Sequence, residues 1–428
     1  MKAAFYTLGC KVNQYETQIM EQELARAGYE IVPSDEAADV YVVNSCTVTG
    51  ESDRKTRQAL RRLKAQNPQS VAVLTGCFPQ SAPEKAASFT EADVVTGVLG
   101  RRNIASLIDK ARRTGSRVIS VGDFESGEEF EPMSAGGFIG HTRAFVKIED
   151  GCESFCSYCV IPYSRGPVRS KPLAALLEEA EGLAARGYRE IVLVGINLSA
   201  YGKDSGHTLM DAVETVCAAP GVERVRLGSL EPKIVTEEFI ERMTRCGKLC
   251  AHFHLSLQSG CAETLRRMNR RYDPDEYRRA VNMLREAFPL CGITTDVIVG
   301  FPGETKEEFS RSLDFVREMR FSQGHVFPYS RRSGTRAAVM PGQVTKNEKA
   351  LRAKLMSEVC AQSKEEFLES LKSKTLPVLF EEEKDGIFTG FAPNYAPVRV
   401  QGSGLHGRIV EVNITGVLPD ACVGVPAG

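Results

Sequence analysis

Three cysteines lie close together in one short stretch, and they constrain the fold and chemistry of this chain more than any other feature. Cys152, Cys156 and Cys159 are separated by three residues and then by two. Thiolate sulfur is a soft ligand that suits iron-sulfur clusters and zinc, so one loop can wrap a small inorganic centre. A closed structural site needs four protein ligands, and three leave one metal position open for a substrate. The spacing predicts chemistry at a cluster, with a zinc loop completed by a distant Cys or His as the alternative.

From residue 144 onward the chain repeats a strand followed by a helix six times. This rhythm is typical of an α/β protein with a parallel sheet, and six units predict a partial barrel that is open on one side. In such barrels the working residues follow the strands, and the cysteine loop follows the first strand. The expected strands cover residues 144–148, 191–194, 225–228, 252–257, 294–299 and 323–327.

Small and polar residues accompany the other expected strands. Gly195, Ser229 and Gln258 come after the second, third and fourth strands, and Asp296 lies within the fifth. Glycine lets the backbone approach a ligand closely, and the polar side chains can bind ribose hydroxyls or an ammonium group. These four residues are candidate ligand contacts, with ordinary turn and helix-capping roles as the alternative.

The first part of the chain also alternates strands and helices, which predicts an open parallel α/β domain over residues 1–115. Cys10, Cys46 and Cys77 each come two residues after the end of an expected strand. Because the carboxyl ends of parallel strands meet at one edge of a sheet, we expect these cysteines to lie together. Either a shared metal site or scattered buried thiols would fit this placement.

The remaining boundaries follow changes in pattern. Residues 116–140 are rich in Gly, Ser and Glu with little periodicity, which predicts a linker before a core over residues 141–370. Residues 345–371 have the apolar spacing of a long helix. Over residues 371–428 short strands alternate with Gly, Pro and Asn, which predicts a small antiparallel β-barrel.

Composition excludes several classes of protein. The N-terminus lacks the pattern of a signal peptide and no run of 18 apolar residues occurs, so we expect a cytoplasmic protein with no membrane association. In such a chain the 13 cysteines indicate metal or redox chemistry rather than disulfides. The net charge is −1, so a polyanion would have to bind at a local patch.

The spacing Cys-x3-Cys-x2-Cys, with Tyr158 just before the last cysteine, resembles the signature of the radical S-adenosylmethionine enzymes. The resemblance implies that Cys152, Cys156 and Cys159 hold a [4Fe-4S] cluster whose fourth iron binds S-adenosylmethionine. Electron transfer to the bound sulfonium then releases a 5′-deoxyadenosyl radical. The resemblance also implies that Tyr158 lies beside the adenine and that the four candidate contacts of the barrel strands bind the cofactor.

The sequences around Cys10, Cys46 and Cys77 resemble the N-terminal domain of the methylthiotransferases, a branch of the same enzymes. The first of them reads Thr-Leu-Gly-Cys-Lys-Val-Asn-Gln-Tyr-Glu-Thr, starting at Thr7. The resemblance implies that these three cysteines bind a second [4Fe-4S] cluster, at which the sulfur to be transferred is held.

The last domain resembles the TRAM domain, an RNA-binding module, between Thr389 and Tyr395. Residues 371–428 hold five Lys or Arg against six Asp or Glu, so this domain is not basic as a whole. We therefore expect local RNA contacts, through Phe391, Tyr395, Arg399 or Arg408.

Within this family, the sequence around Cys10 is most similar to the branch that places a methylthio group on C2 of N6-threonylcarbamoyladenosine at tRNA position 37, beside the anticodon. The expected partners are the tRNA anticodon stem-loop, an electron donor such as a flavodoxin or ferredoxin, and a sulfur donor. The alternatives within the family act on N6-isopentenyladenosine in tRNA or on a ribosomal-protein aspartate. The alternatives outside it are a radical enzyme with one cluster, such as a methylase, and a non-catalytic RNA-binding protein with a structural metal.

Overall fold

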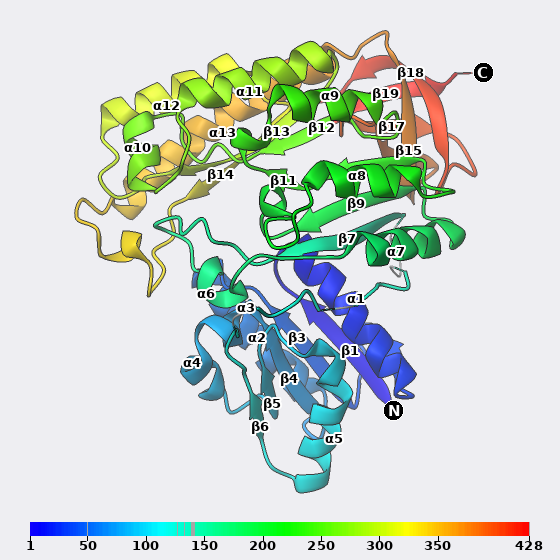
Figure 1. The fold of residues 1–428 in the computed structure, drawn as a ribbon, viewed down its shortest axis with the longest axis vertical. Helices are drawn as coiled ribbons and strands as arrows, with labels where there is room; N and C mark the ends of the chain where they lie inside the picture. The colour runs from blue at the N-terminus through cyan, green and yellow to red at the C-terminus, as the bar shows by residue number, and fades with distance from the viewer. Residues whose placement is uncertain (49, 126, 132, 138–141, 428) are drawn as a thin grey trace.

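The computed structural model describes residues 1–48, 50–125, 127–131, 133–137 and 142–427. An N-terminal α/β domain, a central partial barrel and a small C-terminal β-barrel follow one another along the chain (Figure 1). The central barrel lies between the other two parts. Within the described residues, no helix has the length and apolar character needed to cross a membrane.

The N-terminal domain is built on a six-stranded parallel sheet with the order β2-β1-β3-β4-β5-β6. Every residue of the central strands β3 and β4 is buried, as expected for a parallel sheet with helices on both faces. The strands are β1 (Lys2–Thr7), β2 (Glu30–Val32), β3 (Val40–Ser45), β4 (Val71–Gly76), β5 (Val94–Thr96) and β6 (Val118–Ser120). The helices are α1 (Lys11–Arg26), α2 (Gly50–Gln66), α3 (Cys77–Ser81), α4 (Pro83–Ala87), the 3-10 helix η1 (Arg101–Asn103) and α5 (Ile104–Thr114).

The sequence predicts strands at residues 3–8, 29–32, 40–44, 71–75 and 93–95, which match β1 to β5, but it does not predict β6. This strand lies within residues 116–140, where a linker was predicted, and it pairs with β5 at the edge of the sheet. It is three residues long and two of the three are exposed, so the sequence carries almost no periodic apolar signal. The predicted boundary between residues 140 and 141 lies outside the described residues.

The central part consists of two four-stranded sheets that meet edge to edge, with the orders β10-β9-β7-β8 and β11-β12-β13-β14. A bridge between Val225 of β10 and Leu249 joins them, so six parallel strands follow one another as β7, β9, β10, β12, β13 and β14. In the part of the chain that the structure describes, β7 and β14 are not paired, and the barrel is open there. The predicted partial barrel is confirmed.

The strands of this part are β7 (Arg143–Asp150), β8 (Arg169–Ser170), β9 (Glu190–Gly195), β10 (Arg224–Leu227), β11 (Ser229–Leu230), β12 (His252–Leu255), β13 (Gly292–Val299) and β14 (Gln323–Pro328). Its helices are α6 (Ile161–Arg165), α7 (Leu173–Ala185), α8 (Leu209–Ala218), α9 (Glu237–Arg245), α10 (Ala262–Arg267), α11 (Pro274–Ala287), α12 (Lys306–Met319) and α13 (Lys346–Glu369), with the 3-10 helices η2 (Leu198–Ala200), η3 (Pro232–Ile234) and η4 (Arg336–Val339). Three outer helices begin with a capping box, in which the N-cap side chain and the N3 carboxylate each accept a backbone N–H of the other residue. The N-cap residues are Thr208, Asp273 and Thr305.

The C-terminal part is a closed barrel with the order β15-β16-β17-β19-β18. Its strands are β15 (Thr375–Lys384), β16 (Ile387–Phe391), β17 (Pro397–Gln401), β18 (Ile409–Val417) and β19 (Cys422–Pro426). The predicted small barrel is confirmed, although the sequence did not indicate β19, which contains Gly and Pro. β19 closes the barrel by pairing antiparallel with β18 and parallel with β17.

Candidate active site

The cysteine loop follows β7, the first strand of the central barrel. Gly151 has a φ of +94°, and a Cβ atom there would lie 1.8 Å from the carbonyl oxygen of Pro167. The turn out of the strand therefore requires glycine. The backbone N–H of Cys159 donates to the carbonyl oxygen of Cys156 at 3.0 Å, and α6 begins two residues later. This turn holds Cys152, Cys156 and Cys159 on one partly exposed loop.

Hydrogen-bond donors point at all three of these sulfur atoms, with Asn197 Nδ2 lying 4.0 Å from Cys152 Sγ. Arg270 Nη1 lies 3.3 Å from Cys156 Sγ, and the N–H of Ile161 donates to Cys159 Sγ at 3.4 Å. Among the described residues, Arg270 Nη2 is buried with no hydrogen-bond partner. Burial raises the pKa of Cys159 to about 12, so this thiol stays protonated until a metal displaces the proton. Three thiols on one loop, with a guanidinium to stabilise anionic sulfur, fit a [4Fe-4S] cluster with one open iron.

The predicted cofactor contacts of the barrel lie at the same end as this loop. Gly195 is the last residue of β9, Ser229 follows β10, and Gln258 follows β12. The N–H of Gln258 donates to the carbonyl oxygen of Asp296 at 2.8 Å, so these two residues are neighbours. Ser229 is exposed and Gln258 is buried. The structure brings the four residues to one end of the sheet, and their contact with the cofactor remains a prediction.

Tyr158 points into the barrel end from the cysteine loop. Its ring packs edge to face against Phe301, which follows β13, with ring centroids 6.2 Å apart. The loop around it is fixed by Ser157, whose N–H donates to the carbonyl oxygen of Met268 at 3.0 Å. Tyr158 thus lies where the cysteine loop meets the end of β13, a place compatible with its predicted position beside an adenine.

Sequence reasoning did not identify Glu149, near the end of β7. Burial raises the pKa of this carboxyl to about 8. Its Oε2 accepts the N–H of Asn197 at 2.6 Å, and its Oε1 has no hydrogen-bond partner among the residues described. A Cβ atom on Gly195 would lie 2.7 Å from Oε2, so glycine leaves room for this carboxyl. Its place at the carboxyl end of the first barrel strand, three residues before Cys152, is the signal that could have identified it.

The early cysteines lie at one edge of the N-terminal sheet. Cys10 is the N-cap of α1, Cys46 follows β3, and Cys77 begins α3 directly after β4. A Cβ atom on Gly9 would lie 3.0 Å from Cys46 Cβ, so the first two loops are in contact. Cys10 is exposed, whereas Cys46 and Cys77 are 8% and 3% exposed. Burial, together with the neighbouring Cys77, raises the pKa of Cys46. The three thiols therefore form one group at the surface that faces the barrel.

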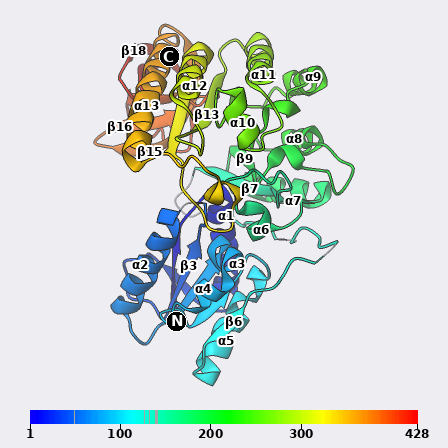
Figure 2. The same ribbon diagram turned by 90° about the vertical axis from the view of Figure 1, so that its left-hand side faces the viewer.

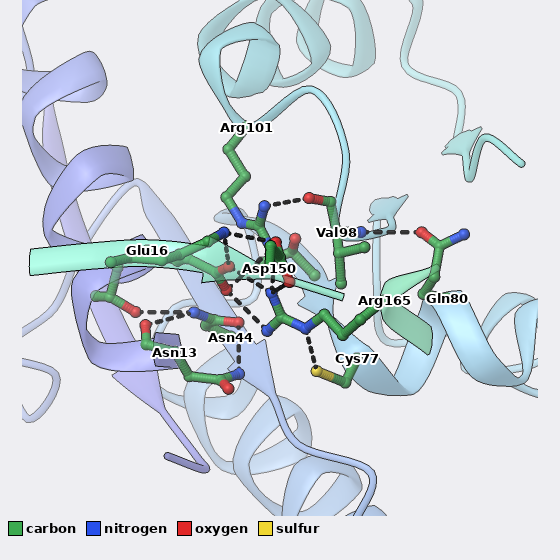
Figure 3. Close-up of polar contacts among 12 residues, drawn as sticks. Asn13, Glu16, Asn44, Cys77, Gln80, Val98, Arg101, Asp150 and Arg165 are labelled. Atoms are coloured by element: carbon green, nitrogen blue, oxygen red, sulfur yellow. Dashed lines mark hydrogen bonds and ion pairs between the residues drawn. The ribbon is translucent and has the colours of Figure 1, made fainter. Parts of the chain in front are cut away.

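Arg165, the last residue of α6, reaches Cys77 and Glu16 of the N-terminal domain (Figure 3). Its Nε donates to Cys77 Sγ at 3.2 Å, and its Nη2 donates to Glu16 Oε2 at 3.0 Å. The side chains of Arg165 and Glu16 are both 0% exposed. Glu16 lies on α1, the helix that begins directly after Cys10, and Arg165 follows Cys159 by six residues. One guanidinium thus reaches from the helix after the late cysteines to the early ones.

The ion-pair network around Glu16 and Asp150 has more cations than carboxylates in its buried part. Lys147 Nζ lies 2.9 Å from Glu16 Oε1 and 2.6 Å from Asp150 Oδ2. The buried cations are Arg101, Lys147, Arg165 and Arg169. Two further carboxylates, of Glu128 and Glu131, approach from the more exposed margin at 3.6 Å.

Charges in this network control its protonation. Burial disfavours the ionised form of Glu16, but Arg101, Arg165 and Lys147 together outweigh burial and hold the pKa of Glu16 at about 2. The same kind of balance, with Lys147 as the strongest cation, lowers the pKa of Asp150. Both carboxyls are therefore ionised, and the Nε of Arg165, which points at Cys77 Sγ, favours the anionic thiolate that a cluster requires.

A second connection between the cysteine sets runs through residues 330–338, which we call the bridging segment. Arg332 Nη2 donates to Thr47 Oγ1 at 2.5 Å, one residue after an early cysteine. The N–H of Ala337 donates to the carbonyl oxygen of Ser157 at 2.8 Å, inside the later cysteine loop. Figure 2 shows this segment, in yellow, in front of the junction between the N-terminal domain and the barrel. The bridging segment therefore contacts both sets of loops.

The structure places Phe391 and Tyr395 against the central barrel, which differs from the expectation that they contact RNA. The two rings stack with centroids 4.7 Å apart, and Tyr395 also stacks on His252 at 4.6 Å. The guanidinium of Arg226 lies 4.9 Å from the Tyr395 centroid. The Tyr395 ring is thus covered by Phe391 and His252, and it packs the C-terminal barrel against the central one. Of the other expected RNA contacts, Arg408 is exposed.

Two family models match the chain, and the fold is similar to those of solved enzymes. The model described as "Uncharacterized protein family UPF0004" matches residues 2–97, and that of the "Radical SAM superfamily" matches residues 146–316. The radical S-adenosylmethionine methyltransferase TsrM from Kitasatospora setae has a TM-score of 0.56 at 15% identity, covering 79% of this chain and 74% of that chain. The cobalamin-dependent S-adenosylmethionine radical enzyme OxsB has a TM-score of 0.52 at 12% identity, covering 86% and 56%. At these identities the similarity concerns the fold alone.

Curated relatives are similar over nearly the whole chain. "Threonylcarbamoyladenosine tRNA methylthiotransferase MtaB" from Bacillus subtilis is 38% identical, over 96% of this chain and 93% of the relative. The protein of the same name from Aquifex aeolicus is 36% identical, over 97% and 100%. A "tRNA-2-methylthio-N(6)-dimethylallyladenosine synthase" from Clostridium novyi is 35% identical, over 88% and 84%.

The fold and the later cysteine loop define a radical S-adenosylmethionine enzyme. The similarity over the whole chain shows more: the chain belongs to the methylthiotransferases of this superfamily. It is therefore an enzyme that transfers a methylthio group and uses S-adenosylmethionine with a [4Fe-4S] cluster.

Proposed function

We propose that this enzyme attaches a methylthio group to C2 of N6-threonylcarbamoyladenosine at position 37 of tRNA, giving the 2-methylthio derivative, with two [4Fe-4S] clusters. The observation that carries the proposal is the hydrogen bond from Arg165, six residues after Cys159 in the chain, to Cys77 Sγ at 3.2 Å. The substrate nucleoside is taken from the names of the relatives from Bacillus subtilis and Aquifex aeolicus.

Each set of cysteines serves one cluster in this proposal. Cys152, Cys156 and Cys159 hold the cluster that binds S-adenosylmethionine, and Cys10, Cys46 and Cys77 hold the cluster at which sulfur is presented. When bound, these groups would supply a carbon radical that takes up the aromatic hydrogen atom and the sulfur that takes its place, because no side-chain base could remove that hydrogen as a proton.

The other residues bind and orient. Arg270 and Arg165 donate hydrogen bonds to cysteine sulfur and stabilise its anionic form. The orphaned Oε1 of Glu149 is available to accept the ammonium group of S-adenosylmethionine. The predicted contacts Tyr158, Gly195, Ser229, Gln258 and Asp296 line the rest of the cofactor site.

The proposal assigns a task to each part of the chain. Residues 1–115 carry the second cluster, residues 116–140 link it to the core, residues 141–370 bind S-adenosylmethionine, and residues 371–428 contact RNA. The partners are the anticodon stem-loop of tRNA, an electron donor such as a flavodoxin or ferredoxin, and a sulfur donor, all in the cytoplasm.

The proposal is tested with anaerobically reconstituted protein and tRNA that carries N6-threonylcarbamoyladenosine. Iron and sulfide analysis should give about eight of each per chain, and nucleoside mass spectrometry should detect the 2-methylthio derivative. Four irons per chain in active protein would contradict the two clusters. A product formed on threonylcarbamoyl tRNA but not on isopentenyl tRNA would support the substrate.

The second candidate substrate is N6-isopentenyladenosine in tRNA. It is favoured by relatives such as that from Clostridium novyi, whose name gives the dimethylallyl nucleoside at 35% identity. The same assay decides between the two, because methylthiolation of isopentenyl tRNA alone would overturn the threonylcarbamoyl assignment.

A further inference from the structure

Two aromatic side chains of the cysteine loop and its following helix are exposed to solvent. Phe155, directly before Cys156, is 49% exposed, and Tyr163, on α6, is 59% exposed. Their ring centroids lie 6.0 Å apart at an interplanar angle of 72°. In an edge-to-face pair, one ring directs its edge at the other and leaves its own two faces uncovered by that partner. The pair therefore offers a flat apolar face to solvent.

Phe155 is held outward against its conformational preference. Its φ is +45°, a left-handed conformation that bulky side chains rarely adopt. Asn269 Nδ2 donates to the carbonyl oxygen of Phe155 at 2.9 Å and fixes this backbone. A strained backbone that exposes a large apolar ring marks a position where exposure serves a function.

The aromatic pair belongs to the later cysteine loop and to the helix that packs beside an early cysteine. Phe155 stands between Cys152 and Cys156 in the chain, and the helix that carries Tyr163 packs against α3, which begins at Cys77. Figures 1 and 2 both place α6 beside α3 at the junction of the N-terminal domain and the barrel. A molecule resting on the pair would therefore lie next to both candidate cluster sites.

Two segments that contact the cysteine loop each carry an exposed arginine. Arg271 follows Asn269 by two residues in the segment that holds Phe155. Arg336 precedes Ala337, whose N–H donates to the cysteine loop at Ser157. Both arginines are exposed. Flat apolar rings with cations on neighbouring segments suit a ligand that is itself flat and aromatic and carries phosphates along its edge, which describes an unpaired stretch of RNA.

We propose that Phe155 and Tyr163 form a stacking platform for unpaired RNA bases adjacent to the nucleotide that reacts. This inference rests on the proposed tRNA substrate and deepens it. The reacting adenosine must leave its stack to reach a buried site, and its neighbours lose stacking partners when it does. The platform replaces those lost contacts, while Arg271 and Arg336 contact the adjoining phosphates.

The test measures binding of a fluorescein-labelled anticodon hairpin to cluster-loaded protein by anisotropy, without S-adenosylmethionine. We expect Tyr163→Ala to raise the Kd about 10-fold, since stacking one base on an aromatic ring is worth about 5- to 100-fold in affinity. Tyr163→Phe, which keeps the ring, should bind like the wild type. Phe155→Ala should resemble Tyr163→Ala, and Ile119→Ala, which alters an exposed apolar residue on β6, should have no effect.

Hairpins with an abasic site on either side of the target adenosine identify the stacked base. An abasic site at the position whose base stacks on the ring already removes this contact and weakens binding. With that hairpin, Tyr163→Ala should raise the Kd little further, because both changes remove the same contact. An unchanged Kd for Tyr163→Ala would overturn the proposal, and so would an equal increase in Kd with every hairpin. Either result would indicate that the exposed rings bind a protein partner or have a purely structural role. If the wild type methylthiolates the same hairpin once S-adenosylmethionine and a reductant are added, such a result refutes the platform alone. If the wild type neither binds nor modifies any hairpin, the proposed function fails as well.

Discussion

One buried arginine lies at each junction between the central barrel and a neighbouring domain. Both arginines pair with a buried glutamate, but their other contacts differ. At the N-terminal junction Arg165 pairs with Glu16, and at the C-terminal junction Arg226 pairs with Glu190. All four side chains are 0% exposed. The remaining donors of Arg226 go to neutral backbone, the carbonyl oxygens of residues 392 and 393 at 3.3 and 2.9 Å. The Nε of Arg165 instead goes to a cysteine thiol.

The difference indicates what each junction does. The C-terminal junction satisfies its arginine with neutral groups and covers it with the Tyr395 ring, so it is complete as a docking surface. The N-terminal junction directs a guanidinium at sulfur, an arrangement that favours an anionic thiolate at that position. One junction therefore attaches a domain, and the other forms part of a reaction site.

Replacing each arginine in turn should give the largest effects and tests whether the two junctions differ in function. Arg165→Ala and Arg226→Ala should each destabilise the cluster-free protein by about 1–3 kcal/mol, because each removes one of the three cations that pair with a buried glutamate. Only Arg165→Ala should also halve the iron content and abolish methylthiolation, since only that arginine contacts a cysteine. Chemical denaturation and iron analysis measure the two effects. Equal iron loss in both variants would show that the junctions do not differ in function.

Glu16→Gln probes the charge balance of the N-terminal junction through pH. The pKa of Glu16 is lowered to about 2, so its ionisation stabilises the fold above about pH 4.5 and this contribution is lost as pH falls toward 2. The contribution is on the order of 3 kcal/mol. Denaturation of the cluster-free protein should show that Glu16→Gln removes it at pH 7 and flattens the acid dependence. The exposed Glu223→Gln should change stability by less than about 1 kcal/mol.

Arg332→Ala tests whether the bridging segment positions the two sets of cysteines. The substitution removes the hydrogen bond to Thr47 and the ion pair with Asp53 at 3.1 Å, but no contact with the later cysteine loop. We expect S-adenosylmethionine cleavage to continue while the methylthiolated product falls about 10-fold. The measured ratio of 5′-deoxyadenosine to product should therefore rise. Arg332→Lys should restore part of the coupling, and a parallel loss of cleavage and product would argue against a positioning role.

Tyr395→Leu should have the smallest effect, confined to the C-terminal junction. Loss of stacking and of the cation–π contacts should cost about 1–2 kcal/mol and increase proteolysis between α13 and β15. Iron content and S-adenosylmethionine cleavage should equal those of the wild type. A change in iron content would mean that the two junctions are coupled.

The sequence predicted the parts of this site that follow from local pattern. The positions of Cys10, Cys46 and Cys77 at one sheet edge follow from strand periodicity, since parallel strands align their carboxyl ends. The pairing of Arg165 with Glu16 could not be predicted, because the partners lie 149 residues apart and a buried arginine looks like any other in a sequence. The docking of Tyr395 was missed for the same reason, since an aromatic residue in a turn suits solvent, RNA or a neighbouring domain equally well.

The central claim is that the two sets of cysteines hold two clusters at one shared junction. Electron paramagnetic resonance of the dithionite-reduced protein tests it most directly, with two triple variants for comparison. One variant carries Ala at Cys10, Cys46 and Cys77, and the other carries Ala at Cys152, Cys156 and Cys159. We predict that each variant retains one [4Fe-4S] signal and that the wild-type spectrum is broadened by magnetic coupling between neighbouring clusters. A wild-type spectrum equal to the sum of the two variant spectra, or one that shows a single cluster, would contradict the account.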